Sequence, residues 1–189
     1  MNKPVYNRGR ISPLKFALWA GLASISMMFA GFLSAYLVRQ SAGNWFEFVL
    51  PNLFLWSTGI ILLSSLTMFR AVKAFRDEDE RLYKSMLLAT FCLGIVFIIT
   101  QYQGWLAMQE AGIDLKGNPS GAFVYLISGV HVAHVVGGIA ALFVALIHGF
   151  TLPFKVTERR KTRLDITAHY WHYVDILWVV LYLFLTLYR

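Results

Sequence analysis

Charged residues are scarce in this chain of 189 amino acids, and their scarcity excludes most soluble architectures. Only 14% of the residues are charged, whereas 58% are hydrophobic and the mean hydropathy is +0.58. A soluble domain carries about 25% charged residues. The composition therefore indicates an integral membrane protein. Cysteine is almost absent as well: the lone Cys92 lies within an apolar run, where we interpret it as a small packing residue, and no disulfide can form within the chain.

Familiar catalytic and nucleotide-binding motifs are also missing. The sequence has no glycine-rich phosphate loop, no Gly-x-Ser-x-Gly elbow and no Cys-x-x-Cys pair. The net charge of +7 does not predict a nucleic-acid partner, because the basic residues gather between the apolar runs, as in membrane proteins. No paired inverted repeat or interrupted helix is visible, which counts against a small transporter.

Five long apolar runs predict five transmembrane helices in a single domain over residues 1–189. Runs of at least about 18 apolar residues are long enough to cross the membrane as helices, and their continuity argues against the alternating strands of a β-barrel. The fold class is therefore an all-α bundle in the membrane. The predicted spans cover about residues 16–38, 52–70, 85–108, 121–152 and 169–188.

The polar segments between the runs are strongly asymmetric in charge. Residues 1–15, 70–84 and 153–168 hold 14 of the 17 lysines and arginines, since 4, 5 and 5 fall in them. Basic segments stay on the cytoplasmic side, so the N-terminus is predicted inside and the C-terminus outside. In the middle segment we expect the two helices to continue past the bilayer and turn within the acidic run 77–80.

We expect the small and hydroxyl-bearing residues inside the runs to serve in helix packing. Ser64, Ser65 and the serines of the first run are interpreted as packing or backbone-bonded residues without a functional role. Small side chains at steps of three and four predict a face on the first helix that a neighbouring helix can approach closely. This face comprises Ala20, Ser24, Met27, Gly31 and Ser34.

The last two runs hold all five histidines and one acid, Asp175, and Asp165 lies just before the fifth run. Ionisable groups in hydrocarbon normally face a partner. On the fourth run His131, His134 and His148 share one helical face. On the fifth, Asp165 and His172 align, flanked by His169 and Asp175. We predict that the two polar faces meet at a similar depth, in the inner half of the bilayer.

Two interpretations of these residues are open. His131 and His134, one helical turn apart, could bind a metal ion with an oxygen ligand from Asp165 or Asp175, or two facing imidazoles could hold a haem. Alternatively the side chains form a hydrogen-bonded network that fastens helices together or holds a lipid headgroup. We adopt the second interpretation, because five histidines do not make the histidine boxes of membrane di-iron enzymes.

The same residues resemble a known family. Residues 128–138, SGVHVAHVVGG, are similar to the Gly-x-His-Gly-x-His-x-x-x-Gly stretch of subunit III of haem–copper respiratory oxidases. Residues 164–178 resemble its closing acidic residue and Tyr-Trp-His-Phe-Val-Asp-x-x-Trp signature, and residues 27–36 resemble its first core helix. Two positions depart from the pattern: Ile25 stands in place of a frequent family glutamate, whose carboxylate-dependent roles cannot be carried over, and Val132 in place of a glycine.

The resemblance implies a non-catalytic, five-helix subunit III of a cytochrome c oxidase in the bacterial cytoplasmic (inner) membrane, without haem or copper of its own. Its expected partners are the large haem-bearing subunit I, subunit II and phospholipid; membership of a larger respiratory supercomplex is left open. Subunit III of a quinol oxidase is the nearest alternative, and a small haem- or metal-binding membrane enzyme a more distant one. The residues expected to form a structural or lipid-contacting network are His131, His134, Asp165, Trp171, His172 and Asp175.

Overall fold

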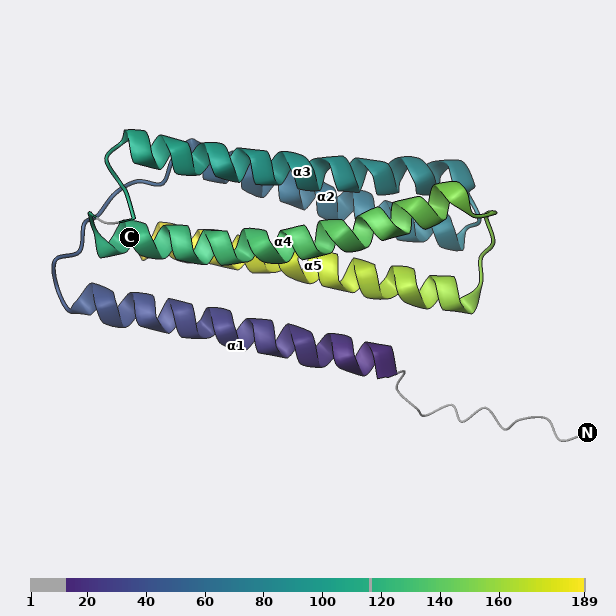
Figure 1. Cartoon of the computed structure of the whole chain (residues 1–189), viewed down its shortest axis with the longest axis horizontal. Coiled ribbons are helices and arrows are strands. Elements are labelled where there is room, and N and C mark those ends of the chain that lie inside the picture. The colour runs from purple at the N-terminus through teal and green to yellow at the C-terminus, as the bar shows by residue number, and fades with distance from the viewer. Residues whose placement is uncertain (1–12, 116, 189) are drawn as a thin grey trace, which may run out of the picture.

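The computed structural model describes residues 13–115 and 117–188, and this part of the chain forms five helices and no strand (Figure 1). Each helix is long and apolar enough to cross a membrane. The predicted all-α bundle of five membrane helices is therefore confirmed. The helices are α1 Pro13–Ser41, α2 Asn52–Arg76, α3 Glu80–Glu110, α4 Pro119–Thr151 and α5 Glu158–Leu187.

Local side chains define several helix ends. The Asp79 carboxylate accepts a hydrogen bond of 2.9 Å from the Leu82 amide at the start of α3, and the Asn118 side chain accepts one of 2.9 Å from the Ser120 amide at the start of α4. Such caps satisfy amides that have no carbonyl partner in the first helical turn. At its other end α4 stops shortly before Pro153, as expected for the residues preceding a proline.

The polar connections near residues 77–80 and 153–168 differ in form. The turn between α2 and α3 lies within the acidic run, which confirms that both helices continue beyond their apolar runs. The second connection is shorter than expected, because α5 already begins at Glu158 and most of the basic segment is helical. Thr157 caps this helix by accepting a hydrogen bond of 3.3 Å from the Arg160 amide.

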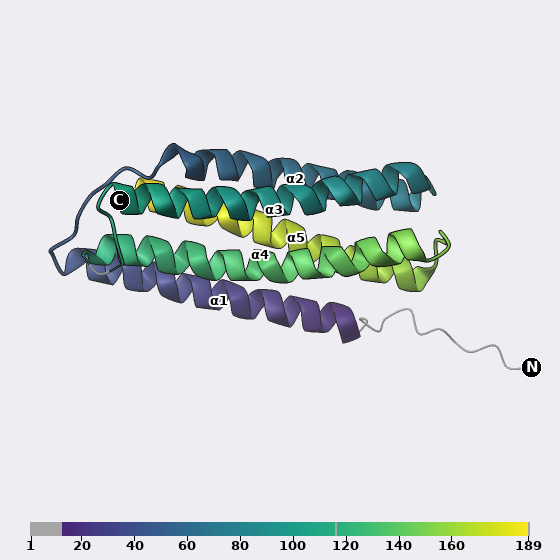
Figure 2. The same cartoon turned by 45° about the horizontal axis from the view of Figure 1, so that its top comes forward.

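The helices form a bundle in which α2 and α3 lie side by side and α1 lies at the edge (Figures 1 and 2). In the described part of the chain α1 packs only against α4 and α5. The α2–α3 turn and the α4–α5 connection lie at the same end of the bundle as the start of α1, and we call this the basic end. Which side of the membrane it faces stays a prediction, and the charges at residues 1–12, 116 and 189 lie outside the described residues.

The face that α1 buries is not the predicted one. Its buried side chains are the large Leu22, Phe29 and Tyr36. The small-residue face points away from the bundle: Met27 is 76% exposed, and a Cβ at Gly31 would meet no atom within 4 Å. The expectation that this face receives a neighbouring helix is therefore wrong for the described helices of this chain.

Candidate functional site

Polar side chains of α5 lie along the face that packs against α2. The two helices run antiparallel, so successive residues along α5 meet residues progressively nearer the start of α2. We call this row of contacts the α2–α5 seam. Its four pairs are Asp165–Arg76 at 2.8 Å, Trp171 Nε1–Ser64 Oγ at 3.0 Å, His172 Nδ1–Ser65 Oγ at 2.6 Å and Trp178 Nε1–Thr58 Oγ1 at 3.0 Å.

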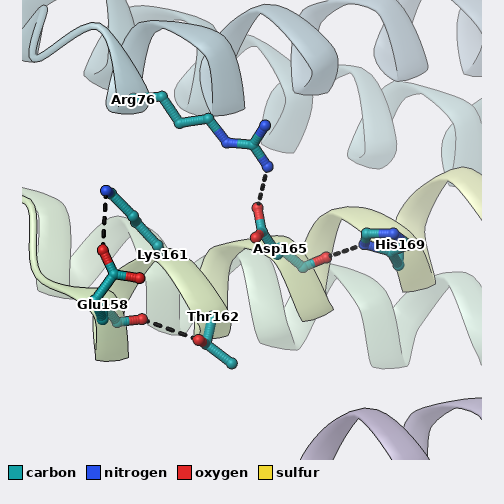
Figure 3. A network of polar contacts seen from close by, with 6 residues as sticks. All are labelled: Arg76, Glu158, Lys161, Thr162, Asp165 and His169. Atoms are coloured by element: carbon teal, nitrogen blue, oxygen red, sulfur yellow. Dashed lines mark hydrogen bonds and ion pairs between the residues drawn. The ribbon is translucent and has the colours of Figure 1, made fainter. Parts of the chain in front are cut away.

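The first pair of the seam lies at the basic end, where the Arg76 side chain reaches across to Asp165 (Figure 3). The two side chains are 57% and 23% exposed, so water and salt screen the pair and it contributes only about 0–1 kcal/mol. One turn further along α5, His169 Nδ1 lies 2.6 Å from the Asp165 carbonyl oxygen. Because a carbonyl oxygen only accepts, His169 carries its proton on Nδ1.

The interior pairs of the seam are shielded from solvent. Trp171 and Trp178 are 1% and 0% exposed, and each indole N–H donates to a hydroxyl of α2. An indole N–H left without an acceptor in hydrocarbon would be costly, so these bonds hold α2 and α5 in one register. Nearby, Gln101 of α3 donates to Ser57 of α2 at 2.9 Å, which extends the polar contacts to a third helix.

The serines have partners that sequence reasoning missed. Ser64 and Ser65 bond to α5, and Ser26 of α1 lies 2.7 Å from the Tyr173 hydroxyl. The interpretation of these serines as backbone-bonded is confirmed for Ser24, Ser26 and Ser64, which donate to backbone carbonyls, but it missed the side-chain bonds to α5. A signal was present: Thr58 and Ser65 are seven residues apart, as are Asp165 and His172, so each pair aligns on its own helix.

The histidines of α4 do not join this seam. His131 is 0% exposed, and its ring lies 4.9 Å from that of Trp178 and 5.8 Å from that of Phe97, measured between centroids. Within the part of the chain that the structure describes, neither ring nitrogen of His131 has a hydrogen-bond partner. His134 Nδ1 instead lies 2.7 Å from the carbonyl oxygen of Val130 in its own helix.

The predicted meeting of the two polar faces is found only in part among the described residues, since His131 packs on the Trp178 ring of α5 but makes no hydrogen bond to it. The depth of this contact in the bilayer stays a prediction. The polar groups of α5 bond to α2, and the contact from α5 to His134 is a hydrogen bond of 3.0 Å from the Tyr170 hydroxyl to its backbone carbonyl. His148 lies farther along α4, at a cavity near the basic end. The physical reason is that α5 has α2 as an additional neighbour, and the serines and Thr58 of α2 offer its polar groups closer partners.

The placement of the histidines also bears on the metal interpretation. Within residues 13–115 and 117–188, no three His, Cys, Asp or Glu side chains gather closely enough to hold a metal ion. His131 packs among aromatic rings while His172 bonds to α2, so these two imidazoles do not face one another across a space for haem. This arrangement favours the fastening interpretation; that the chain carries no cofactor stays a prediction.

A cavity of about 550 Å³ opens near the basic end, where α4 and α5 separate (Figure 1). Apolar side chains such as Leu14, Phe75 and Val144 line it, together with the basic Arg160 and Arg163 and with His148. Arg160 also donates to the carbonyl oxygens of residues 153 and 155, at 2.8 and 3.3 Å, and so holds the α4–α5 connection in place. Sequence reasoning missed this cavity, since apolar periodicity carries no signal of where two helices diverge.

Known proteins match this chain along most of its length. A family described as "Cytochrome c oxidase subunit III" matches residues 14–189. A probable cytochrome c oxidase subunit 3 of Nocardia farcinica is 30% identical over 186 residues, which cover 93% of this chain and 87% of the relative. A cytochrome c oxidase subunit 3 of Corynebacterium diphtheriae is 28% identical, with 86% and 80% covered. A probable quinol oxidase subunit 3 of Staphylococcus saprophyticus is 25% identical, with 89% and 85% covered.

The match and the site agree with each other. The five helices, each long and apolar enough to cross a membrane, are consistent with the matched family of membrane subunits. The family match covers more than half of the chain and includes both helices of the seam. The chain belongs to the cytochrome c oxidase subunit III family of the haem–copper oxidases.

Proposed function

We propose that this chain is the non-catalytic third subunit of a cytochrome c oxidase, where it stabilises the large haem-bearing subunit I and binds structural lipid. Subunit II completes the expected complex, in a bacterial cytoplasmic membrane. The observation that carries the proposal is the α2–α5 seam, whose indole and imidazole groups bond to hydroxyls of α2 rather than lining a reacting centre. The names of several relatives support the choice of oxidase.

A quinol oxidase is the second candidate, supported by the Staphylococcus relative. The two candidates differ in their electron donor. Purification of the tagged chain in a mild detergent, followed by identification of the co-purifying chains and turnover with cytochrome c or with quinol, separates them. Recovery of the chain without any haem-bearing partner would contradict both.

His172→Ala tests the supporting role. Removal of the imidazole leaves Ser65 without its bond to α5, at a cost of about 1–3 kcal/mol. With its helices held less firmly, this subunit is expected to dissociate more readily from the complex during purification, while the visible haem spectrum stays unchanged. The measurement is the ratio of this chain to subunit I after purification, together with the spectrum.

His169→Ala is the matched control, because that exposed imidazole bonds only to a carbonyl of its own helix. We expect its complex to retain the subunit as the wild type does. Loss of haem from the complex while the His172→Ala subunit stays attached would contradict the proposal.

The cavity at the basic end supports the lipid-binding part of the proposal. Its volume of about 550 Å³ lies in the range of ligand sites, and its apolar walls suit an acyl chain. Arg160 and Arg163 line the same cavity, and arginine binds phosphate by paired, charge-assisted hydrogen bonds. An acidic phospholipid matches both features.

Arg163→Gln is expected to lower the amount of acidic phospholipid that co-purifies with the complex. A basic residue near an anionic headgroup contributes about 1 kcal/mol, which corresponds to about a fivefold loss of affinity. Mass spectrometry of extracted lipid measures the effect. Arg159→Gln is the control, since Arg159 is exposed and lies outside the cavity lining; equal lipid content in both variants would count against the cavity.

A further inference from the structure

Asp175 is an acidic residue of α5 for which the described residues supply no hydrogen-bond partner and no ion pair. It lies on α5 between the His172 and Trp178 pairs, is 1% exposed, and neither of its side-chain oxygens has a hydrogen-bond partner. The ion pairs of the described residues all lie elsewhere, toward the basic end. The nearest guanidinium of the seam, Arg76, is engaged by Asp165, about 15 Å away along α5 at 1.5 Å per residue.

The groups around Asp175 do not compensate a negative charge. His172 on its own helix bonds to Ser65, and the Ser65 hydroxyl lies beside the Asp175 carboxyl, outside hydrogen-bonding geometry. The described polar side chains that α3 buries in the bundle are Thr90, Thr100 and Gln101, which carry no charge. From α4 comes His131, which packs on the ring of Trp178, and from α1 comes Ser26, which bonds to Tyr173.

An ionised carboxylate in such surroundings is strongly unfavourable, because burial removes it from bulk solvent and no cation or bonded donor of the described residues replaces its hydration. A protonated carboxyl carries no charge, and its O–H can donate one hydrogen bond. Protonation therefore removes the unfavourable burial of a negative charge at Asp175.

We propose that Asp175 is a proton-binding site within the membrane interior, which holds its proton at neutral pH and shares it in a chain of hydrogen bonds with Ser65 and His172. The carboxyl turns toward the Ser65 hydroxyl and donates its O–H to Oγ. Ser65 then donates its own hydrogen across the 2.6 Å contact to Nδ1 of His172. His172 accepts at Nδ1 and carries its proton on Nε2, so the Asp175 and Ser65 hydroxyls each donate once within the chain.

Infrared spectroscopy of the purified oxidase complex tests the protonation state directly. At pH 7 the wild-type spectrum is expected to contain a C=O band of a protonated carboxyl that Asp175→Asn removes. Asp165→Asn is the control and should leave this band unchanged, because Asp165 is ion-paired to Arg76. A difference spectrum in which Asp175→Asn removes only carboxylate bands would overturn the proposal.

Two further readouts test the proposal independently of the infrared difference between Asp175→Asn and wild type. Ser65→Ala removes the acceptor of the acid, so the C=O band should shift to higher frequency; an unshifted band would overturn the chain of hydrogen bonds.

Asparagine has the shape of the neutral acid and retains a donor, so Asp175→Asn should keep the subunit in the complex within about twofold of wild type. A loss of about tenfold or more would show that the negative charge is required, and would also overturn the proposal. The infrared result concerns this chain's own carboxyl and stands apart from the choice between cytochrome c and quinol oxidase.

Discussion

Trp171→Ala is expected to lower the free energy of unfolding of the bundle by about 3–5 kcal/mol. The indole is 1% exposed, packs against the backbone at Gly94 of α3 and Gly138 of α4, and donates its N–H to Ser64 of α2. Alanine leaves both a cavity and a hydroxyl without its donor. Unfolding by a denaturing detergent, starting from mild micelles, measures the change.

Trp56→Ala is the control for this experiment. Trp56 is 67% exposed on α2, so its removal takes away little buried area and should change the free energy of unfolding far less. Equal losses in the two variants would show that Trp171 does not connect the helices as described here.

Gly138→Ala is expected to destabilise the same contact from the opposite side, by about 1–3 kcal/mol. A Cβ at this position would lie 2.8 Å from an atom of the Trp171 ring and 3.3 Å from the ring of Tyr170. The Trp171 ring cannot move away, because Gly94 and the bond to Ser64 hold its other edges. The added methyl group therefore has to push α4 away from Trp171. The same unfolding assay measures the loss of stability.

Gly129→Ala offers a matched comparison on the same helix, since a Cβ there would meet no atom within 4 Å. Alanine is a better helix former than glycine, so this variant should be neutral or slightly more stable. If Gly138→Ala proved as stable as Gly129→Ala, the tight packing of α4 against Trp171 would be refuted.

These contacts give Trp171 a structural role within residues 164–178, the stretch that resembles the closing signature of the family. One side chain touches α2, α3 and α4 from its position on α5, and so it sets the spacing of four helices at once. Lipid supplies no hydrophobic force between apolar helices, so close contacts at glycine and hydrogen bonds between helices have to hold the bundle together. The Trp178 and His172 pairs of the seam continue this pattern along α5.

The amino-acid sequence by itself determined the number of helices, their all-α class and the family. Apolar runs of this length have few alternatives in a membrane, because every backbone group must be bonded within its own segment. Helical periodicity also predicted correctly that Asp165 and His172 share a face, since both contact α2. The His131 and Asp175 side chains were recognised as unusual from their surroundings in the sequence alone.

Only the tertiary structure decided which helix each face meets. Periodicity assigned His131 and His172 to a common cluster, whereas packing placed His131 among aromatic rings and His172 against Ser65. It also turned the small-residue face of α1 away from the bundle and opened the cavity at the basic end. The physical reason is that lipid accepts any apolar face equally well, so a single helix does not reveal its neighbours; those follow from the fit of side chains across all five helices.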